Sequence, residues 1–419
     1  MILSVLLSLV NEDLRGISRC VVGGILVRTD DPHGVLAGVR VLELGHIVAG
    51  PTASLILAAL GADVIKVERP GSGDQARFSR GNQGYFLAFN ACKRSITLDL
   101  KAPHGKEAFT RLLKTADVVI DNYGPEVLKR MGFGSADLRR INPQIIHCGI
   151  KGFLSGPYED RNLLDEPAQM MGGLAYMTGP PGMPLRAGAS IVDITGAMFG
   201  VISILAALHR RGSTGHGETL RVGLFETVVF LVSQHIAKAG ISGEVPPPMT
   251  ERGAGRDLGW GIYRVFETKD QRHVFIGVTS DTQWASYCRE FGLHDLWADA
   301  RLRVNAGRRE QFAMLTEHTE ALVRSFTFHE IIAKLEHANI PHAPINTPMD
   351  LFTHPHLAAR GHLTTLTAPD DTSSPIPGLP IEFDSVRLPT PTNPPKLGEH
   401  TASILRELGY TDEDIARWR

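Results

Sequence analysis

The chain has 419 residues, of which 43 % are hydrophobic and 21 % charged, a composition that is ordinary for an enzyme and long enough for two domains. Its formal net charge of −2 provides no general attraction for nucleic acid or an anionic membrane, so we expect neither as a partner. The four cysteines are widely spaced and form no CxxC pair. We therefore expect no metal site, no disulfide framework and a cytoplasmic location.

Residues 1–35 are predicted to be an N-terminal extension. Residues 1–10 are apolar but lack a basic region and are too short to span a membrane. A targeting peptide, a docked helix and an extension from an upstream start codon remain open, and we favour the last.

From residue 39 onwards, predicted strands alternate with predicted helices. The strands cover residues 39–45, 63–68, 117–122 and 144–150, and the helices cover residues 51–60, 105–115 and 136–140. This alternation is typical of an α/β domain with a parallel sheet.

The second half of the chain begins with a Gly-, Met- and Pro-rich stretch that ends near residue 188. The pattern then predicts helices over residues 194–211 and 225–239, a strand over 219–224, a linker over 241–256, and a hairpin of strands 261–268 and 273–279. We expect a large Rossmann-like α/β domain (36–226 and 328–419) and a smaller α+β domain (227–327).

Two basic segments could meet the phosphates of a ligand. Arg69 lies in a glycine-containing turn (VERPGSGD, 67–74) after a predicted strand, where parallel sheets bind phosphorylated ligands. The second segment, CKRSITLDLK (92–101), carries Lys93, Arg94 and Lys101. A plain turn and a solvated basic turn are the alternatives. Neither early βα turn contains GxGxxG, so a dinucleotide cofactor is disfavoured. Tyr123, after the third strand, could stack on a purine.

Asp193 precedes the long helical run 194–211. An aspartate at this position is usually a helix cap, but a carboxylate at a helix N-terminus can also be a desolvated nucleophile. Asp165 and Glu166 supply further acidic groups, and two carboxylates in different environments can divide catalytic roles.

Over residues 35–409 the chain resembles the class III CoA-transferases (CaiB/BaiF type, formyl-CoA transferase-like). The resemblance rests on six blocks in order: GVRVLELGHIVAGP, LGADVIKVERPGSGD, FNACKRSITLDLK, DNYGPEVLKRMGFG, ASIVDITGAMFG and LGEHTASILRELG. It implies an interlocked homodimer that moves CoA between carboxylic acids, with acyl-CoA and small acids as partners. It also implies that Asp193 is the nucleophile and Asp165 a second catalytic residue.

The resemblance also implies a CoA-binding set and a substrate-binding set. The CoA-binding residues would be Val48, Ala49, Arg69, Leu98, Lys101, Asn122, Tyr123 and Arg130. The substrate-binding residues would be His46 and the glycine-loop residues Arg252, Gly253, Gly255 and Arg256.

Three departures from the family pattern affect specificity. Formyl-CoA transferase has glutamine at the position of Val48, lysine at Asn162 and glutamate at Asp165, so formyl and oxalate specificity is not expected. Instead, Arg252 or Arg256 is hypothesised to pair with the second carboxylate of a short dicarboxylic acid such as succinate, mesaconate or a malate-like acid.

Two other functions remain as alternatives. An α-methylacyl-CoA racemase would share the fold and CoA site, but that branch uses a His–Asp pair where this chain has Leu164 and Asp165. A non-catalytic CoA-binding protein would bind CoA equally well after Asp193→Ala.

Overall fold

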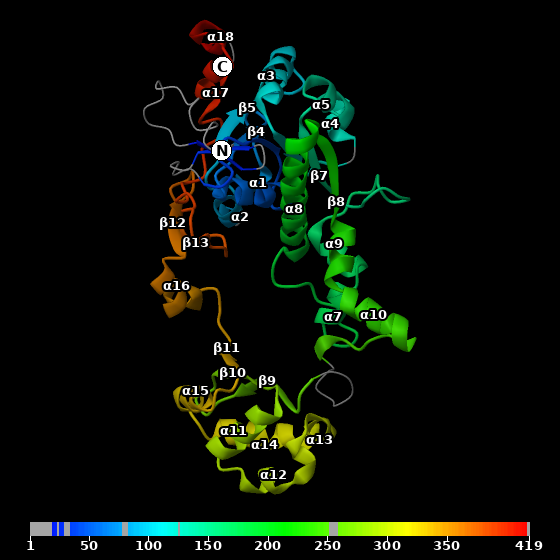
Figure 1. Ribbon diagram of the computed structural model, residues 1–419, viewed down its shortest axis with the longest axis vertical. Helices are drawn as coiled ribbons and strands as arrows, with labels where there is room; N and C mark the ends of the chain where they lie inside the picture. The colour runs from blue at the N-terminus through cyan, green and yellow to red at the C-terminus, as the bar shows by residue number, and fades with distance from the viewer. Residues whose placement is uncertain are drawn as a thin grey trace, which may run out of the picture. The chain divides into compact units, whose positions relative to one another are not determined.

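The computed structural model describes residues 34–77, 83–124, 126–250 and 259–416, together with the backbone of an antiparallel strand pair, β1 (Arg19–Val22) and β2 (Ile25–Arg28). The chain folds into two compact units. Unit 1 comprises Met1–Gly172, Ala187–Val232 and Gly361–Arg419, and unit 2 comprises Gly173–Arg186 and Ser233–Arg360. Figure 1 shows the elements in chain colours.

Unit 1 is built on a six-stranded parallel sheet with the order β5-β4-β3-β6-β7-β8. Its strands are β3 (Arg40–Leu44), β4 (Asp63–Glu68), β5 (Arg94–Thr97), β6 (Val118–Asp121), β7 (Ile146–Lys151) and β8 (Glu218–Gly223). The chain runs outward from β3 to β5 and then returns to the other side of β3 with β6. The loops after β3 and β6 therefore flank a topological switch point, where doubly wound sheets bind their ligands.

Helices cover both faces of this sheet. On one face, α3 (Pro103–Thr115), α5 (Ser135–Ile141) and α17 (Thr401–Glu407) share an apolar core with alternate residues of β3, β4 and β5. On the other face, α8 (Ile191–Thr214) packs against α1 (Ala49–Ala59), β7 and β8 (Figure 1). Because Ile404 and Leu405 of α17 are fully buried in the core, the C-terminal segment completes unit 1.

The remaining elements of unit 1 are short. They are η1 (Gln75–Arg77), α2 (Gln83–Phe89), α4 (Val127–Met131), α6 (Asp165–Met171), α9 (Leu224–Leu231), β12 (Leu363–Thr367), β13 (Ser373–Pro377) and α18 (Asp412–Ala416).

Unit 2 contains a three-stranded antiparallel sheet with the order β11-β10-β9. Its strands are β9 (Ile262–Glu267), β10 (His273–Val278) and β11 (His342–Pro344). Its helices are α7 (Leu174–Thr178), α10 (Ser233–Ser242), α11 (Asp281–Glu290), α12 (His294–Ala298), η3 (Ala300–Arg303), α13 (Asn305–Glu310), α14 (Phe312–Arg324), α15 (Phe328–His337), η4 (Asp350–Thr353) and α16 (Pro355–Arg360).

The α/β class with a parallel sheet is confirmed, and so is the hairpin, as β9 and β10. Two details of the prediction were wrong. Residues 225–239 do not form one helix, because α9 ends at Leu231 and α10 begins at Ser233. The predicted domain boundary at residue 328 also differs from the structure, because α15 buries Ile331 and Leu335 in the core of unit 2.

Helix α8 is apolar and long enough, by length and composition, to cross a membrane, as are α9 and α10 taken together. Part of the apolar composition of α8 is explained by its packing within unit 1. Gly196 and Gly200 face that packing surface, and a Cβ at Gly200 would lie 3.4 Å from the Sγ of Cys148 on β7. A buried face of this kind is expected of a core helix.

Candidate active site

The turn after β3 is joined to the loop after β6 across the switch point. The Asn122 side chain holds both sides of the His46 backbone, since its Oδ1 accepts from His46 N at 2.8 Å and its Nδ2 donates to His46 O at 3.0 Å. Ile47 follows with a φ of 63°, a left-handed conformation that is uncommon for a β-branched residue. Such a turn persists only where its surroundings impose it.

A buried cluster of four charged side chains lies beneath this turn. Glu43 accepts from Lys66 at 2.6 Å and from Lys93 at 2.8 Å, and Lys66 also pairs with Asp74 at 2.8 Å. All four side chains are fully excluded from solvent. Asp74 Oδ1 in turn accepts from Ile47 N at 3.1 Å, so the cluster fixes the strained residue. Burial would raise the pKa of Glu43, but the two lysines outweigh burial and lower it.

The predicted phosphate contacts of Lys93 and Arg94 are therefore wrong. The Lys93 ammonium is enclosed by Glu43, while Arg94 lies on β5 and pairs with Asp63 at 2.7 Å. The basic segment 92–101 thus contains a strand that the sequence analysis did not identify, and only Lys101 of its three cations remains available to a ligand.

A pocket of about 430 Å³ opens beside the turn and collects several predicted residues. Its lining includes His46, Arg69, Leu98, Lys101 and Tyr123. The rings of His46 and Tyr123 lie 5.1 Å apart. Within the described part of the chain, the exposed cations Arg69 and Lys101 form no ion pair, whereas the nearby Glu68 is neutralised by Arg77 at 2.7 Å. The pocket thus offers two free cations and aromatic surface.

Burial affects the two ring side chains of this pocket in the same sense, because it disfavours their charged forms. It raises the pKa of Tyr123 to about 12 and, together with the charge of Lys66, lowers the pKa of His46 despite the nearby Asp74. At neutral pH the pocket therefore presents an uncharged imidazole and an uncharged phenol beside the two cations.

Asp193 lies in the first turn of α8 and is not the helix cap. The cap position is Ser190, whose side chain makes no capping hydrogen bond. Asp165 takes over this task, because its Oδ2 accepts from Val192 N at 2.8 Å and from Asp193 N at 3.0 Å. Gln169 orients Asp165 through a hydrogen bond of 2.6 Å. Among the described residues, none forms a hydrogen bond or ion pair with the Asp193 carboxylate.

The environment of Asp193 makes its carboxylate unusually basic. Burial, with a further contribution from the charge of Asp165, raises its pKa to about 7 from an ordinary value of 3.8. A carboxyl group that is unpaired, half-buried and close to neutral in pKa is a candidate for catalysis. Of the two roles considered for Asp193 in the sequence, the cap falls to Asp165, and the nucleophile stays a prediction.

Comparison with known proteins identifies the family of this chain. The model of the family "CoA-transferase family III" matches residues 36–401. The chain belongs to CoA-transferase family III. A succinyl-CoA:glutarate CoA-transferase of Mus musculus is 33 % identical over 392 residues, covering 90 % of this chain and 87 % of the relative. A formyl-CoA:oxalate CoA-transferase of Rhodopseudomonas palustris (strain BisA53) is 34 % identical over 409 residues, covering 91 % and 95 %.

A solved structure is similar to this chain in both fold and sequence. The crystal structure of a CaiB/BaiF family protein from Brucella suis has a TM-score of 0.79 and 33 % identity, covering 90 % of this chain and all of that one. The resemblance drawn from the six sequence blocks is confirmed, and the protein is a CoA-transferase that acts on CoA thioesters.

The other predicted site residues that the structure of this CoA-transferase describes do not line the pocket at the switch point. Val48 and Ala49 are buried where α1 begins. Arg130 is exposed on α4 and does not line the pocket, although its neighbour Met131 does. Arg252, Gly253, Gly255 and Arg256 lie outside the described residues. Among the described residues, no group of three His, Cys, Asp or Glu side chains could hold a metal ion.

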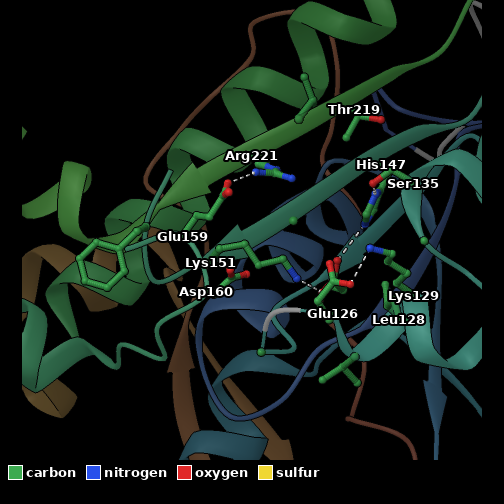
Figure 2. A pocket seen from close by; sticks show the side chains of 17 residues that line it. Glu126, Leu128, Lys129, Ser135, His147, Lys151, Glu159, Asp160, Thr219 and Arg221 are labelled. Atoms are coloured by element: carbon green, nitrogen blue, oxygen red, sulfur yellow. Dashed lines mark hydrogen bonds and ion pairs between the residues drawn. The ribbon is translucent and has the colours of Figure 1, made fainter. Parts of the chain in front are cut away.

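Sequence reasoning missed a second polar site in the CoA-transferase, a pocket of about 330 Å³ lined by residues of β6, β7 and β8 and of the helices after β6 (Figure 2). Its lining includes Asp121, Ser135, His147 and Lys151. His147 Nε2 lies 2.8 Å from Asp121 Oδ2, and Ser135 Oγ lies 3.1 Å from His147 Nδ1. A signal was present in the sequence, since Asp121 ends an otherwise apolar strand and His147 lies within the buried strand β7.

Proposed function

We propose that the enzyme moves CoA from succinyl-CoA to a short dicarboxylic acid through a covalent intermediate on Asp193. The observation that carries the proposal is the Asp193 carboxylate, which is half-buried and unpaired and has a pKa raised to about 7. Related enzymes support the substrate class. The mouse relative and a 34 % identical relative from Agrobacterium fabrum (strain C58 / ATCC 33970) are named for the succinate–glutarate exchange, and the Rhodopseudomonas relative is named for oxalate.

In the first half of the proposed reaction, a carboxylate oxygen of Asp193 attacks the thioester carbonyl of succinyl-CoA. The C–S bond breaks, giving a mixed succinyl–aspartyl anhydride and the CoA thiolate. The thiolate then attacks the aspartyl carbonyl, which forms an aspartyl-CoA thioester and releases succinate. Each step exchanges one activated acyl group for another of similar energy, so covalent capture replaces one difficult exchange with easier ones.

The second half reverses these steps with the acceptor acid. A carboxylate oxygen of the acceptor attacks the aspartyl thioester, again giving an anhydride and the CoA thiolate. The thiolate attacks the acceptor's carbonyl, forms the new acyl-CoA and frees the Asp193 carboxylate. No proton needs to be gained or lost overall.

We place the nucleotide part of CoA in the pocket at the switch point. Arg69 and Lys101 would meet its phosphates, for which free cations are suited. Tyr123 and His46 would provide apolar and aromatic contacts. Asn122, whose amide is fully used by the His46 backbone, would position the turn rather than bind CoA through its side chain.

We also propose that a second copy of the chain covers the outer face of α8. Met198, Ile202 and Leu205 follow helical spacing along this face and are 50 %, 59 % and 37 % exposed. Phe230 of α9, 62 % exposed, extends the stripe through its edge-on contact with Phe199. An apolar stripe of this kind marks an interaction surface. Light scattering should give a dimer for the wild-type chain and a monomer for Met198→Glu/Ile202→Glu, and a wild-type monomer would refute the proposal.

The substrate proposal is tested by incubating the enzyme with succinyl-CoA and a panel of short mono- and dicarboxylic acids, and following acyl-CoA species by mass spectrometry. Dicarboxylates are expected to yield new acyl-CoA thioesters, and Asp193→Asn is expected to yield none. Transfer only to monocarboxylates would exclude the proposed acceptor class. Deuterium exchange at the α-carbon of a branched acyl-CoA, without transfer, would indicate the racemase instead.

The hypothesis about the glycine loop is tested in the same assay. Arg252→Ala/Arg256→Ala is expected to weaken dicarboxylate use while monocarboxylate use persists. Unchanged dicarboxylate use would exclude both arginines as readers of the second carboxylate. The cytoplasmic location stays a prediction from the cysteine pattern.

A further inference from the structure

The loop that carries Tyr123 is held in place by a chain of polar side chains behind it. Asp121 Oδ1 accepts from Tyr123 N at 3.1 Å, and Lys151 Nζ donates to Tyr123 O at 2.9 Å. Lys151 also pairs directly with Asp121. The backbone N–H and carbonyl of Tyr123 are thus both bound by side chains of β6 and β7, so the position of this residue depends on the Asp121 carboxylate.

His147 fixes the other oxygen of that carboxylate. Its Nε2 lies 2.8 Å from Asp121 Oδ2, and Asp121 is completely buried while His147 is 6 % exposed. On the far edge of the ring, Ser135 Oγ lies 3.1 Å from Nδ1 (Figure 2). Because the ionised Asp121 carboxylate can only accept, Nε2 carries a proton and donates it to Asp121, which leaves Nδ1 facing the Ser135 hydroxyl.

The same residues do not make a convincing hydrolytic triad. In a triad the carboxylate orients the imidazole and stabilises the imidazolium that forms during catalysis. Here Asp121 is shared with Lys151 and with the Tyr123 backbone, so much of its charge is already compensated. All three partners of Asp121 instead restrain the carboxylate, and through it the loop.

We propose that His147 is a positioning residue for CoA binding, acting through Asp121 on the Tyr123 loop. The inference rests on the proposed placement of CoA in the pocket lined by Tyr123. Without the Nε2 donor, one oxygen of a fully buried carboxylate loses its partner. The carboxylate then turns toward Lys151 and releases Tyr123 N. Because the reacting Asp193 lies on a different element, the effect falls on CoA affinity more than on turnover.

A pair of variants with similar polarity tests the inference. His147→Gln places an amide nitrogen near the position of Nε2 and keeps a donor for Asp121, whereas the shorter side chain of His147→Asn reaches only the position of Nδ1. The dissociation constant for CoA is measured by calorimetry, and kcat and KM with succinyl-CoA are measured alongside. Losing a hydrogen bond to a buried charged group is expected to weaken CoA binding about tenfold in His147→Asn, with kcat within about threefold of wild type.

His147→Gln is expected to bind CoA within about threefold of wild type. Equal affinity of the two variants, or a loss confined to kcat, would overturn the inference. Tyr123→Ala separates the inference from its premise. If Tyr123→Ala weakens CoA binding but His147→Asn does not, only the positioning role fails. If Tyr123→Ala leaves CoA affinity unchanged, the placement of CoA fails and the inference with it.

Discussion

Replacing Asp193 with asparagine should abolish transfer while stabilising the protein at alkaline pH. The folded protein holds this carboxyl group at a pKa of about 7, compared with an ordinary value of 3.8. Above pH 7 the group is ionised in both the folded and the unfolded chain, and the folded state carries the full cost of a half-buried charge beside Asp165. Asparagine has nearly the same shape and carries no charge, so it removes that cost.

The two pKa values set the size of the effect. Their difference corresponds to about 4 kcal/mol as an upper limit. Because Asp193 is half-buried rather than enclosed, water screens part of this cost, and we expect a gain of about 2 kcal/mol at pH 8. The sign follows from linkage, since a raised carboxyl pKa favours the folded state at low pH and this advantage is lost as pH rises toward 7. The gain from Asp193→Asn should therefore shrink as pH falls and vanish near pH 4.

Thermal unfolding of wild type and Asp193→Asn across pH 4–8 measures this effect. The variant should unfold about 2 °C above wild type at pH 8, and the two midpoints should converge near pH 4. Glu317→Gln, which removes one exposed negative charge from α14, is the matched control and should show no such pH-dependent difference. A midpoint of Asp193→Asn equal to or below wild type at pH 8 would refute the assignment of a raised pKa to Asp193.

Three further predictions concern the same chemistry. The rate of the first half-reaction, measured in a single turnover with succinyl-CoA, should rise with pH through about 7 as Asp193 ionises, and a flat profile would contradict this. Asp165→Asn should move that pH profile to lower pH, because it removes a negative charge beside Asp193. It should also lower the free energy of unfolding by about 1–3 kcal/mol, because it weakens the cap of α8. An unchanged pH profile would count against the electrostatic coupling of the two aspartates. Arg69→Ala should raise the KM for succinyl-CoA about tenfold, while Lys114→Ala, a control at an exposed lysine of α3, leaves it unchanged. Equal KM values for these two variants would remove Arg69 from the CoA site.

The fold was largely predictable because most strands of the parallel sheet are short apolar runs between turn residues. Residues 63–68 form β4 over the predicted range, and the other predicted strands differ from the structure by one to three residues at their ends. β5 was missed because its sequence, RSIT, is short and carries a cation, which favoured a reading as a ligand-binding turn. The ion-pair partners of its Arg94 are Asp63 and Glu407, which are remote in sequence and therefore gave no local signal.

The site was predictable only where local chemistry or the family pattern identified it. Four residues of the predicted CoA-binding set line one pocket together with His46 of the predicted substrate-binding set; the four are Arg69, Leu98, Lys101 and Tyr123. Residue spacing alone favoured a capping role for Asp193, and that role falls to Asp165 because the chain between them folds back onto the helix start. This exchange of roles depends on a contact between residues 28 positions apart, which no periodicity can reveal.

The polar groups that brace the site illustrate the same limit. Glu43 and Lys66 are charged residues within buried strands. Such a position predicts that each side chain forms a buried ion pair, but it does not identify the partner residue. Lys93, which pairs with Glu43, lies outside these strands. Ser135, which forms a hydrogen bond with His147, lies on α5. Their roles follow from the sheet register and the helix packing, which exist only in three dimensions.

The most direct test of the central claim is to trap the covalent intermediate on Asp193. The enzyme is incubated with succinyl-CoA and hydroxylamine, digested, and the peptide that contains Asp193 is examined by mass spectrometry. The proposed mechanism predicts an aspartyl hydroxamate at Asp193 that depends on succinyl-CoA and is absent from Asp165-containing peptides. Transfer of CoA without any modification at Asp193, or with the modification on another residue, would contradict Asp193 as the nucleophile.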